Sequence, residues 1–171
     1  MSKPVFLIGY MGSGKSTAGR KLARVLGYAF EDTDELIASM TGKTIEEIFD
    51  SEGEDAFRIL EHSVIRSLAG RVNTVIATGG GAPCYFDNLS LMQRSGITVY
   101  IKLNPVSIVK RLSQSKTTRP LIKKIGHDQL LPWVTRHLEQ RALFYEKAHI
   151  IFKGENPDLN ELAGQIKSFR P

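Results

Sequence analysis

One short stretch near the beginning of the chain has the residue types and the spacing that bind phosphate groups. Residues 9–16 read GYMGSGKS, which matches the pattern GxxxxGK[ST]. Its glycines allow turns in which successive N–H groups point at phosphate oxygens, and the helix that follows adds the positive end of its dipole. Lys15 supplies a charge for the β- and γ-phosphates, and the hydroxyl of Ser16 can bind Mg²⁺. An apolar run precedes the pattern and a helical repeat follows it, so we interpret it as a nucleotide site and not as an ordinary glycine-rich turn.

Two carboxylates follow the second predicted strand, in the run Asp32-Thr33-Asp34. Ligands of open α/β sheets bind at the carboxyl ends of the strands, and residues two apart at a strand end point the same way. Beside a phosphate-binding turn, one carboxylate can hold Mg²⁺, directly or through water. The other can accept hydrogen bonds from a hydroxyl and orient or deprotonate it. The competing interpretation is that Asp34 only caps the helix that follows it.

Three glycines in a row, Gly79, Gly80 and Gly81, follow a β-branched run at residues 74–76. Successive glycines cost conformational entropy on folding, so we expect that something requires the bare backbone. A small ligand lying against the main chain is one such requirement, and a tight turn from strand to helix is the other.

Two arginines suit the binding of an acid. Arg58 can form a surface pair with Glu54 or Glu61, which is worth little, or it can bind a substrate carboxylate through two parallel hydrogen bonds. Arg141 lies on the inward stripe of a predicted helix, together with Leu130, Val134, Leu138 and Tyr145. A buried guanidinium needs a buried anion, which is either an internal carboxylate or a bound acidic substrate.

A third arginine, Arg119, lies in the basic segment 115–124, whose weak periodicity predicts a mobile lid over about residues 113–125. Arg119 is either a solvated loop charge or a residue that closes over the nucleotide. In the second case it neutralises charge on the transferring phosphoryl group.

These residues need a scaffold, which the hydrophobic pattern predicts. Short apolar runs predict strands near residues 5–8, 28–31, 74–76, 97–103 and 149–152. Helical spacing and capping signals, such as Thr44 with Glu47, predict helices near residues 15–26, 34–40, 44–49, 54–68, 104–112, 128–147 and 157–169. Alternating strands and helices indicate an α/β fold, with a parallel sheet covered on both faces, in one domain over residues 1–171.

Composition and missing motifs exclude several classes of protein. The 171 residues are 42% hydrophobic and 24% charged, which argues against wholesale disorder, and the single cysteine, Cys84, rules out an intramolecular disulfide. No run approaches the ~18 apolar residues of a membrane span or the ~7 of a signal-peptide core, so we expect a cytoplasmic protein. The [NT]KxD pattern of GTPases and the DFG and HRD signatures of protein kinases are absent.

Taken together and in order, these motifs resemble the shikimate kinase family over nearly the whole chain. The matching segments are the phosphate loop GYMGSGKST (9–17), DTD (32–34), FR followed by Glu61, TGGG (78–81), RPL (119–121), Arg141 with Tyr145, and Asn156-Pro157. The resemblance implies a five-stranded sheet in the order 2-3-1-4-5, as in nucleoside monophosphate kinases. It also implies transfer of the γ-phosphoryl group of ATP to the 3-hydroxyl of shikimate, on the way to chorismate and the aromatic amino acids.

The resemblance also implies roles for individual residues. Asp34 contacts the shikimate hydroxyls and acts as the base, and Arg58 and Arg141 bind the carboxylate. Gly80 adds a backbone contact, with Gly79 and Gly81 in the same substrate-binding loop, and the substrate-binding helices span about residues 33–61. Ser16 binds Mg²⁺ directly and Asp32 holds it through water, while Lys15 and Arg119 stabilise the transferring phosphoryl group. The remaining nucleotide contacts come from Gly12, Ser13, Gly14, Thr17, Arg111, Asn156 and Pro157.

Three functions remain to be separated by experiment. The first is a shikimate kinase, the second a kinase for another small polyol or acid such as gluconate, and the third a nucleotide-binding regulatory or nucleic-acid-associated protein without activity. Two arginines, one carboxylate and exposed backbone complement an acid with three hydroxyls. The net charge of +5 is then partly explained by anionic ligands, and we expect a monomer that binds neither nucleic acid nor membranes.

Overall fold

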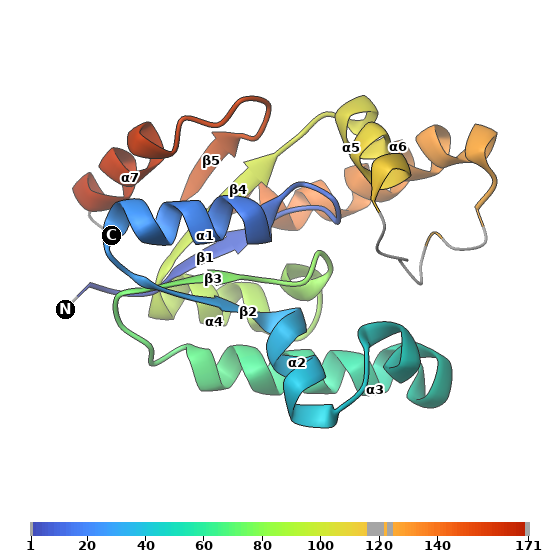
Figure 1. The fold of residues 1–171 in the computed structure, drawn as a ribbon, viewed down its shortest axis with the longest axis horizontal. Helices are drawn as coiled ribbons and strands as arrows, with labels where there is room; N and C mark the ends of the chain where they lie inside the picture. Colours follow the sequence, from blue (N-terminus) through green and yellow to red (C-terminus); the bar gives the residue numbers. More distant parts are fainter. Residues whose placement is uncertain (1, 116–121, 123–124, 170–171) are drawn as a thin grey trace.

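The computed structural model describes residues 2–115, 122 and 125–169. Within these residues, one parallel sheet has five strands in the order β2-β3-β1-β4-β5 (Figure 1). The strands are β1 (Val5–Ile8), β2 (Ala29–Asp32), β3 (Thr74–Ala77), β4 (Ile97–Lys102) and β5 (Ile150–Lys153). The predicted fold class and strand order are confirmed. Arg119 and most of the predicted lid lie outside the described residues.

Helices cover both faces of the sheet. On one face lie α1 (Lys15–Leu26) and α7 (Leu159–Ser168), and on the other lie α3 (Ile45–Leu68), α4 (Asn88–Ser95) and α6 (His127–Tyr145) (Figure 1). The helices α2 (Thr33–Thr41) and α5 (Pro105–Gln114) follow β2 and β4. None of the helices in the described part of the chain combines the length and the apolar character needed to span a membrane.

The core is split in two by the sheet, as the central strand β1 illustrates. Its four residues are fully buried and alternate between the faces. Val5 and Leu7 belong to the apolar cluster with α1 and α7, whereas Phe6 and Ile8 belong to the cluster with α3, α4, α5 and α6. A strand that is apolar on both sides therefore ends at the phosphate-binding pattern, which fixes that loop at the carboxyl edge of the sheet.

Local signals in the sequence set several helix ends. Thr44 and Glu47 form the predicted capping box at the start of α3. Gly53 has a non-helical backbone (φ 84°, ψ 173°) that kinks α3, which matches the two separate helices predicted at 44–49 and 54–68. The kink lets the second part of α3 run under the sheet and carry Arg58 and Glu61 inward.

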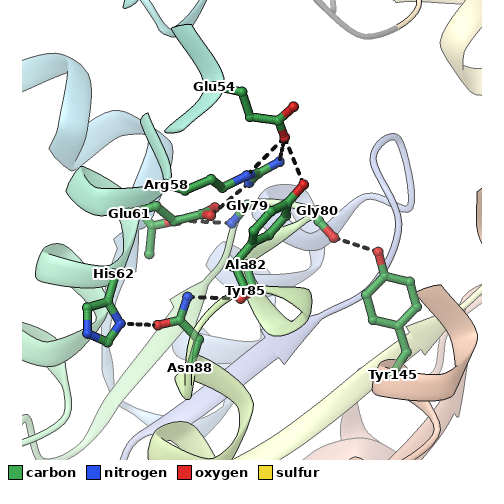
Figure 2. Close-up of polar contacts among 11 residues, drawn as sticks. Glu54, Arg58, Glu61, His62, Gly79, Gly80, Ala82, Tyr85, Asn88 and Tyr145 are labelled. Atoms are coloured by element: carbon green, nitrogen blue, oxygen red, sulfur yellow. Dashed lines mark hydrogen bonds and ion pairs between the residues drawn. The ribbon is translucent and has the colours of Figure 1, made fainter. Parts of the chain in front are cut away.

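The sequence analysis did not predict α4 or the short 3-10 helix η1 (Ala82–Cys84). The N-cap Asp87 of α4 makes no side-chain capping bond, so the local start signal is weak. Tertiary contacts hold this region: the side chain of Asn88 donates to the carbonyl of Ala82 (2.9 Å) and its Oδ1 lies 2.6 Å from Nδ1 of His62 (Figure 2). The buried Asn88 therefore links α4 to η1 and to His62 of α3, and periodicity alone does not indicate these contacts.

Candidate active site

The phosphate-binding pattern forms the connection between β1 and α1. Gly12 (φ 76°) and Gly14 (φ 86°) adopt left-handed conformations that side chains disfavour. Gly14 is the N-cap of α1 and offers no side-chain oxygen to the N–H groups of the first turn. These donors, together with the positive end of the helix dipole, therefore face the space above the loop, where an anion binds favourably.

Lys15 and Ser16, the first residues of α1, point their side chains to opposite sides of this loop. The buried ammonium of Lys15 donates to the carbonyls of Gly9 and Tyr10, each at 2.8 Å. The hydroxyl of Ser16 donates to Oδ2 of Asp32 at 2.6 Å. A carboxylate at the end of β2 and a hydroxyl at the start of α1 thus form one oxygen pair beside the loop.

Asp32, and not Asp34, caps α2. Its Oδ1 accepts hydrogen bonds from the backbone N–H groups of Asp34 (3.0 Å) and Glu35 (3.4 Å). The competing interpretation of Asp34 as a helix cap is therefore wrong. The reason is that α2 begins at Thr33, directly after β2, so Asp32 takes the capping position and Asp34 lies inside the helix. Asp34 lies in the first turn of α2 and lines a cavity instead.

The Ser16–Asp32 pair fits Mg²⁺. This ion keeps several waters and typically takes one or two protein oxygens together with substrate phosphates. Within the described residues there is no group of three or more His, Cys, Asp or Glu side chains that could hold a metal alone. A site with two protein oxygens suits a metal that arrives with a nucleotide.

Arg111 ties the phosphate loop to the end of the sheet. Its guanidinium donates to the carbonyls of Ser13 (3.0 Å) and Gly154 (3.3 Å), which joins α5, the loop and the segment after β5. Asn156 and Pro157 are exposed further along that segment. The cavity above the loop, the phosphate-loop cavity, has a volume of about 300 Å³ and is lined by Met11, Gly12, Gly14, Lys15, Ser16, Thr17, Asp32, Asp34, Thr78, Gly80, Arg111, Leu112 and Ser115. Asn156 and Pro157 do not line it.

A second cavity of about 70 Å³, the arginine cavity, adjoins the first. It is lined by Met11, Asp34, Ile45, Phe49, Phe57, Arg58, Glu61, Gly79, Gly80, Gly81 and Arg141. Met11, Asp34 and Gly80 line both cavities. A molecule in the arginine cavity therefore meets Asp34 and the Gly80 backbone at the boundary with the phosphate-loop cavity.

Arg58 is held by two carboxylates of its own helix (Figure 2). It donates to Oε2 of Glu61 at 2.8 Å and to Oε1 of Glu54 at 2.8 and 3.1 Å, and it lies 4.1 Å from the centre of the Tyr85 ring. The predicted pairs exist, but the guanidinium is only 4% exposed, so the interpretation as a surface pair is wrong. Burial alone would lower the pKa of Arg58, but the two carboxylates raise it above its ordinary value.

Arg141 is buried in the same cavity without such a partner. Among the described residues, no carboxylate lies within ion-pair distance of its guanidinium. The side chain is 7% exposed and lies 5.9 Å from the centre of the Tyr10 ring. An internal carboxylate within the described residues therefore does not account for this buried charge, and its burial in the cavity suits the binding of an anion.

The three glycines of the run are required because neighbouring protein atoms lie too close to their backbone for a side chain to fit. A Cβ atom on Gly79 would lie 2.2 Å from Oε1 of Glu61, and one on Gly81 would lie 2.6 Å from Nη2 of Arg58. A Cβ atom on Gly80 would lie 2.9 Å from the backbone nitrogen of Met11 in the phosphate loop. None of the three has a positive φ, so a turn that only glycine can adopt is not the reason.

Some site residues are not evident from the sequence. Ile45, Phe49 and Phe57 form an apolar wall of the arginine cavity. The hydroxyl of Tyr10 lies 2.8 Å from Nδ1 of His137, which links the phosphate loop to α6, and Tyr145 donates to the carbonyl of Gly80 (Figure 2). The inward stripe that contains Arg141 and Tyr145 is the one signal in the sequence that points to these contacts.

A further groove lies away from both cavities, between the end of the sheet and α6. It is lined by Tyr100, Lys102, Leu103, Asn104, Pro105, Thr135, Leu138, Glu139, Ala142, Glu146, Lys153 and Glu155. No residue of the phosphate loop or of the glycine run lines it. The chemistry that the sequence predicts is therefore gathered in the two adjoining cavities.

A parallel sheet in the order 2-3-1-4-5, with a phosphate loop after its central strand and a cavity with two buried arginines beside it, is the arrangement of a phosphate-loop kinase that acts on small molecules. The family model for shikimate kinase matches residues 11–169. The chain belongs to the shikimate kinase family.

Individual relatives agree with this assignment. A shikimate kinase from Parabacteroides distasonis is 43% identical over 153 residues, which cover 90% of this chain and 88% of the relative. The crystal structure of shikimate kinase from Bacteroides thetaiotaomicron has a TM-score of 0.86 at 40% identity and covers 95% of this chain and 94% of that one. Shikimate kinase from Acinetobacter baumannii in complex with shikimate has a TM-score of 0.86 at 35% identity, with 98% and 92% covered.

A gluconokinase from Sinorhizobium meliloti is also similar in structure, with a TM-score of 0.60 over 96% of this chain and 89% of that one. At 21% identity, this likeness shows the shared fold alone.

Proposed function

We propose that the protein transfers the γ-phosphoryl group of ATP to the 3-hydroxyl of shikimate, which gives shikimate 3-phosphate and ADP in the route to aromatic amino acids. The observation that carries the proposal is the shared wall of the two cavities, where Asp34 and Gly80 separate the phosphate loop from a pocket with two buried arginines. A small acid bound there by its carboxylate presents its hydroxyls towards the nucleotide.

The acid is bound by charge and by backbone. Arg141, which has no ion-pair partner among the described residues, and Arg58 bind the carboxylate, because a guanidinium matches a carboxylate with two parallel hydrogen bonds. The backbone of Gly80 lines the pocket beside the substrate, and the Tyr145 hydroxyl holds its carbonyl in place. Phe49 and Phe57 cover the ring and exclude water.

The phosphoryl group moves in line between two oxygens. The 3-hydroxyl oxygen attacks the γ-phosphorus, the bond from that phosphorus to the β,γ-bridging oxygen breaks, and Asp34 accepts or orients the hydroxyl proton. Lys15 and the N–H groups of the loop stabilise the charge that develops on the phosphates. Mg²⁺ held by Ser16 and Asp32 would neutralise further charge on the nucleotide. Arg119, which lies outside the described residues, is proposed to close over the transferring group.

A coupled assay of ADP release tests this function. With ATP and Mg²⁺, we expect turnover with shikimate and at least about a hundredfold lower kcat/KM with gluconate, which carries a carboxylate on a flexible chain. Equal or better turnover with gluconate would assign the protein to the second class of kinase. Nucleotide binding without turnover on any small acid would favour the regulatory protein.

A further inference from the structure

Glu61 is a buried carboxylate that the proposed mechanism does not use. It lies on α3 with 0% exposure. Its Oε2 accepts the hydrogen bond from Arg58, whereas its Oε1 has no hydrogen-bond partner among the described residues (Figure 2). A buried carboxylate oxygen without a donor is unfavourable, and a proton on that oxygen removes most of the cost.

The groups around Glu61 come from four elements. Arg58 belongs to the same helix, Asp34 faces it from α2, Arg141 from α6 and the Cys84 thiol from η1. Oε1 of Glu61 and Oδ1 of Asp34 both face the Gly79 backbone, because a Cβ atom there would lie 2.2 Å and 3.1 Å from them. The negative charge on Glu61 is therefore destabilised by the carboxylate of Asp34 and stabilised by the guanidinium groups of Arg58 and Arg141.

Near neutral pH, the interactions that favour the ionised form of Glu61 and those that favour its protonated form are close to balanced. Burial and the charge of Asp34 raise the pKa of Glu61 to about 7, although Arg58 and Arg141 lower it. The second carboxylate on Arg58 behaves differently: burial opposes ionisation, but hydrogen bonds from Arg58 and Tyr85 hold the pKa of Glu54 below its ordinary value. An acid that enters the cavity adds a negative charge and draws on the same two guanidinium groups, which shifts Glu61 further towards its protonated form.

We propose that Glu61 takes up a proton from solvent when the acidic substrate binds, so that the substrate carboxylate replaces the charge of Glu61 beside Arg58. The step forms one O–H bond on the carboxyl group of Glu61 and breaks none in the substrate. This inference rests on the proposed function, since it requires a carboxylate in the arginine cavity. It makes Glu61 a positioning residue, which keeps the net charge of the cavity constant.

Calorimetry of shikimate binding to the wild-type protein tests the proposal. Titrations at about pH 8 in phosphate and in Tris, which differ in ionisation enthalpy, give the number of protons exchanged, and we expect uptake of roughly half a proton or more per shikimate. Binding without proton exchange would overturn the inference and leave the proposed function intact. Absence of shikimate binding would overturn both.

Three variants assign the proton to one group. In Glu61→Gln, which keeps the shape of the side chain, proton uptake disappears while shikimate still binds. In Glu54→Gln, the matched change on the other side of Arg58, uptake persists because Glu54 stays ionised. Cys84→Ala also keeps it, because burial raises the pKa of that thiol. Persistent uptake in Glu61→Gln would assign the proton elsewhere and contradict the proposal.

The wild-type protein gives a second test that needs no variant. If Glu61 must be protonated in the complex, the Kd for shikimate rises with pH above about 7, by up to about tenfold per pH unit. A Kd that stays constant between about pH 7 and 9 would overturn the inference.

Discussion

The phosphate-loop cavity and the arginine cavity share a wall, yet the chain builds them in opposite ways. In the first, the phosphate-binding groups come from eight successive residues: backbone N–H groups and one helix end provide them, and Lys15 donates to the carbonyls of its own loop. The second gathers side chains from α2, α3 and α6 around the backbone of the glycine run, and it holds two buried arginines with unequal numbers of partners.

Because of this difference, ligand binding and the stability of the fold are coupled to different degrees in the two cavities. A backbone site costs the fold little when a side chain is removed, because its donors remain. In a cavity of buried charges, ligand binding is coupled to folding, because each buried charge is stabilised by its partner. Removal of one partner leaves the other charge buried and unpaired, which destabilises the fold. Variants in the two cavities should therefore differ in which property they change.

The largest effect is expected at the shared wall. Replacing Asp34 with Asn should lower kcat by about 10²–10⁴, because the hydroxyl proton loses its acceptor, while ADP affinity stays unchanged. Steady-state kinetics and ADP titration measure the two. Glu35→Gln, in the same turn of α2 but exposed, is the matched control and should keep the wild-type rate. A near-normal kcat for Asp34→Asn would show that the carboxylate only positions the substrate.

Next in size is the phosphate loop. Lys15→Ala should lower kcat by about 10²–10³, because one positioned charge on the transferring phosphate is lost. The Kd for shikimate should stay within about twofold of wild type, as measured by calorimetry, since the arginine cavity is intact. Lys21→Ala, at an exposed position of α1, controls for the change of charge. Loss of shikimate binding in Lys15→Ala would contradict the claim that the arginine cavity binds shikimate independently of the phosphate loop.

The two arginines sharpen the comparison within the second cavity. Arg58→Ala and Arg141→Ala should each raise KM for shikimate by at least about tenfold, because each removes a charged hydrogen-bond donor from the carboxylate. Only Arg58→Ala should also destabilise the fold, by about 3–5 kcal/mol in urea unfolding, because it strands the buried Glu61. Equal destabilisation by both variants would contradict the unequal partnering seen in the structure.

The smallest effect is a pH dependence of stability with opposite signs at two residues. Burial lowers the pKa of His137 from 6.5 to about 4, so the unfolded chain binds more protons and the contribution of His137 to stability is lost as pH falls through this range. The raised pKa of Glu61 has the reverse effect: the native state binds more protons between pH 4.5 and about 7, so its contribution falls as pH rises.

Urea unfolding between these pH values checks both signs. The stability advantage of wild type over His137→Asn should grow as pH rises from about 4 to 6.5, and its advantage over Glu61→Gln should shrink as pH rises from 4.5 to about 7. Parallel profiles would show that the pKa of neither group differs between the folded and the unfolded protein.

The sequence predicts the phosphate-loop cavity better than the arginine cavity, because the binding groups of the first are close together in the chain and those of the second are not. The phosphate loop depends on neighbours in the chain, so its glycines, Lys15 and the flanking strand and helix already specify it. The capping box at Thr44 and the break near Gly53 are likewise local. Strand order follows from the resemblance to a family.

The arginine cavity depends on contacts between distant residues. Helical spacing brings Arg58 next to Glu54 and Glu61, but it does not reveal that the cluster is buried under Tyr85. The glycine run signals a need for bare backbone, but only the structure identifies Glu61, Met11 and Arg58 as the atoms that leave no room. Asp32 replaces Asp34 as the cap because α2 begins at Thr33, without a loop between it and β2, which the local pattern does not indicate.

The most direct test of the account is a crystal structure with shikimate, ADP and Mg²⁺ bound. We expect the shikimate carboxylate between Arg58 and Arg141, and its 3-hydroxyl beside Asp34 and facing the nucleotide on the phosphate loop. Shikimate bound in the groove beside Lys102 and Glu146, or bound with its hydroxyls turned away from the loop, would contradict it.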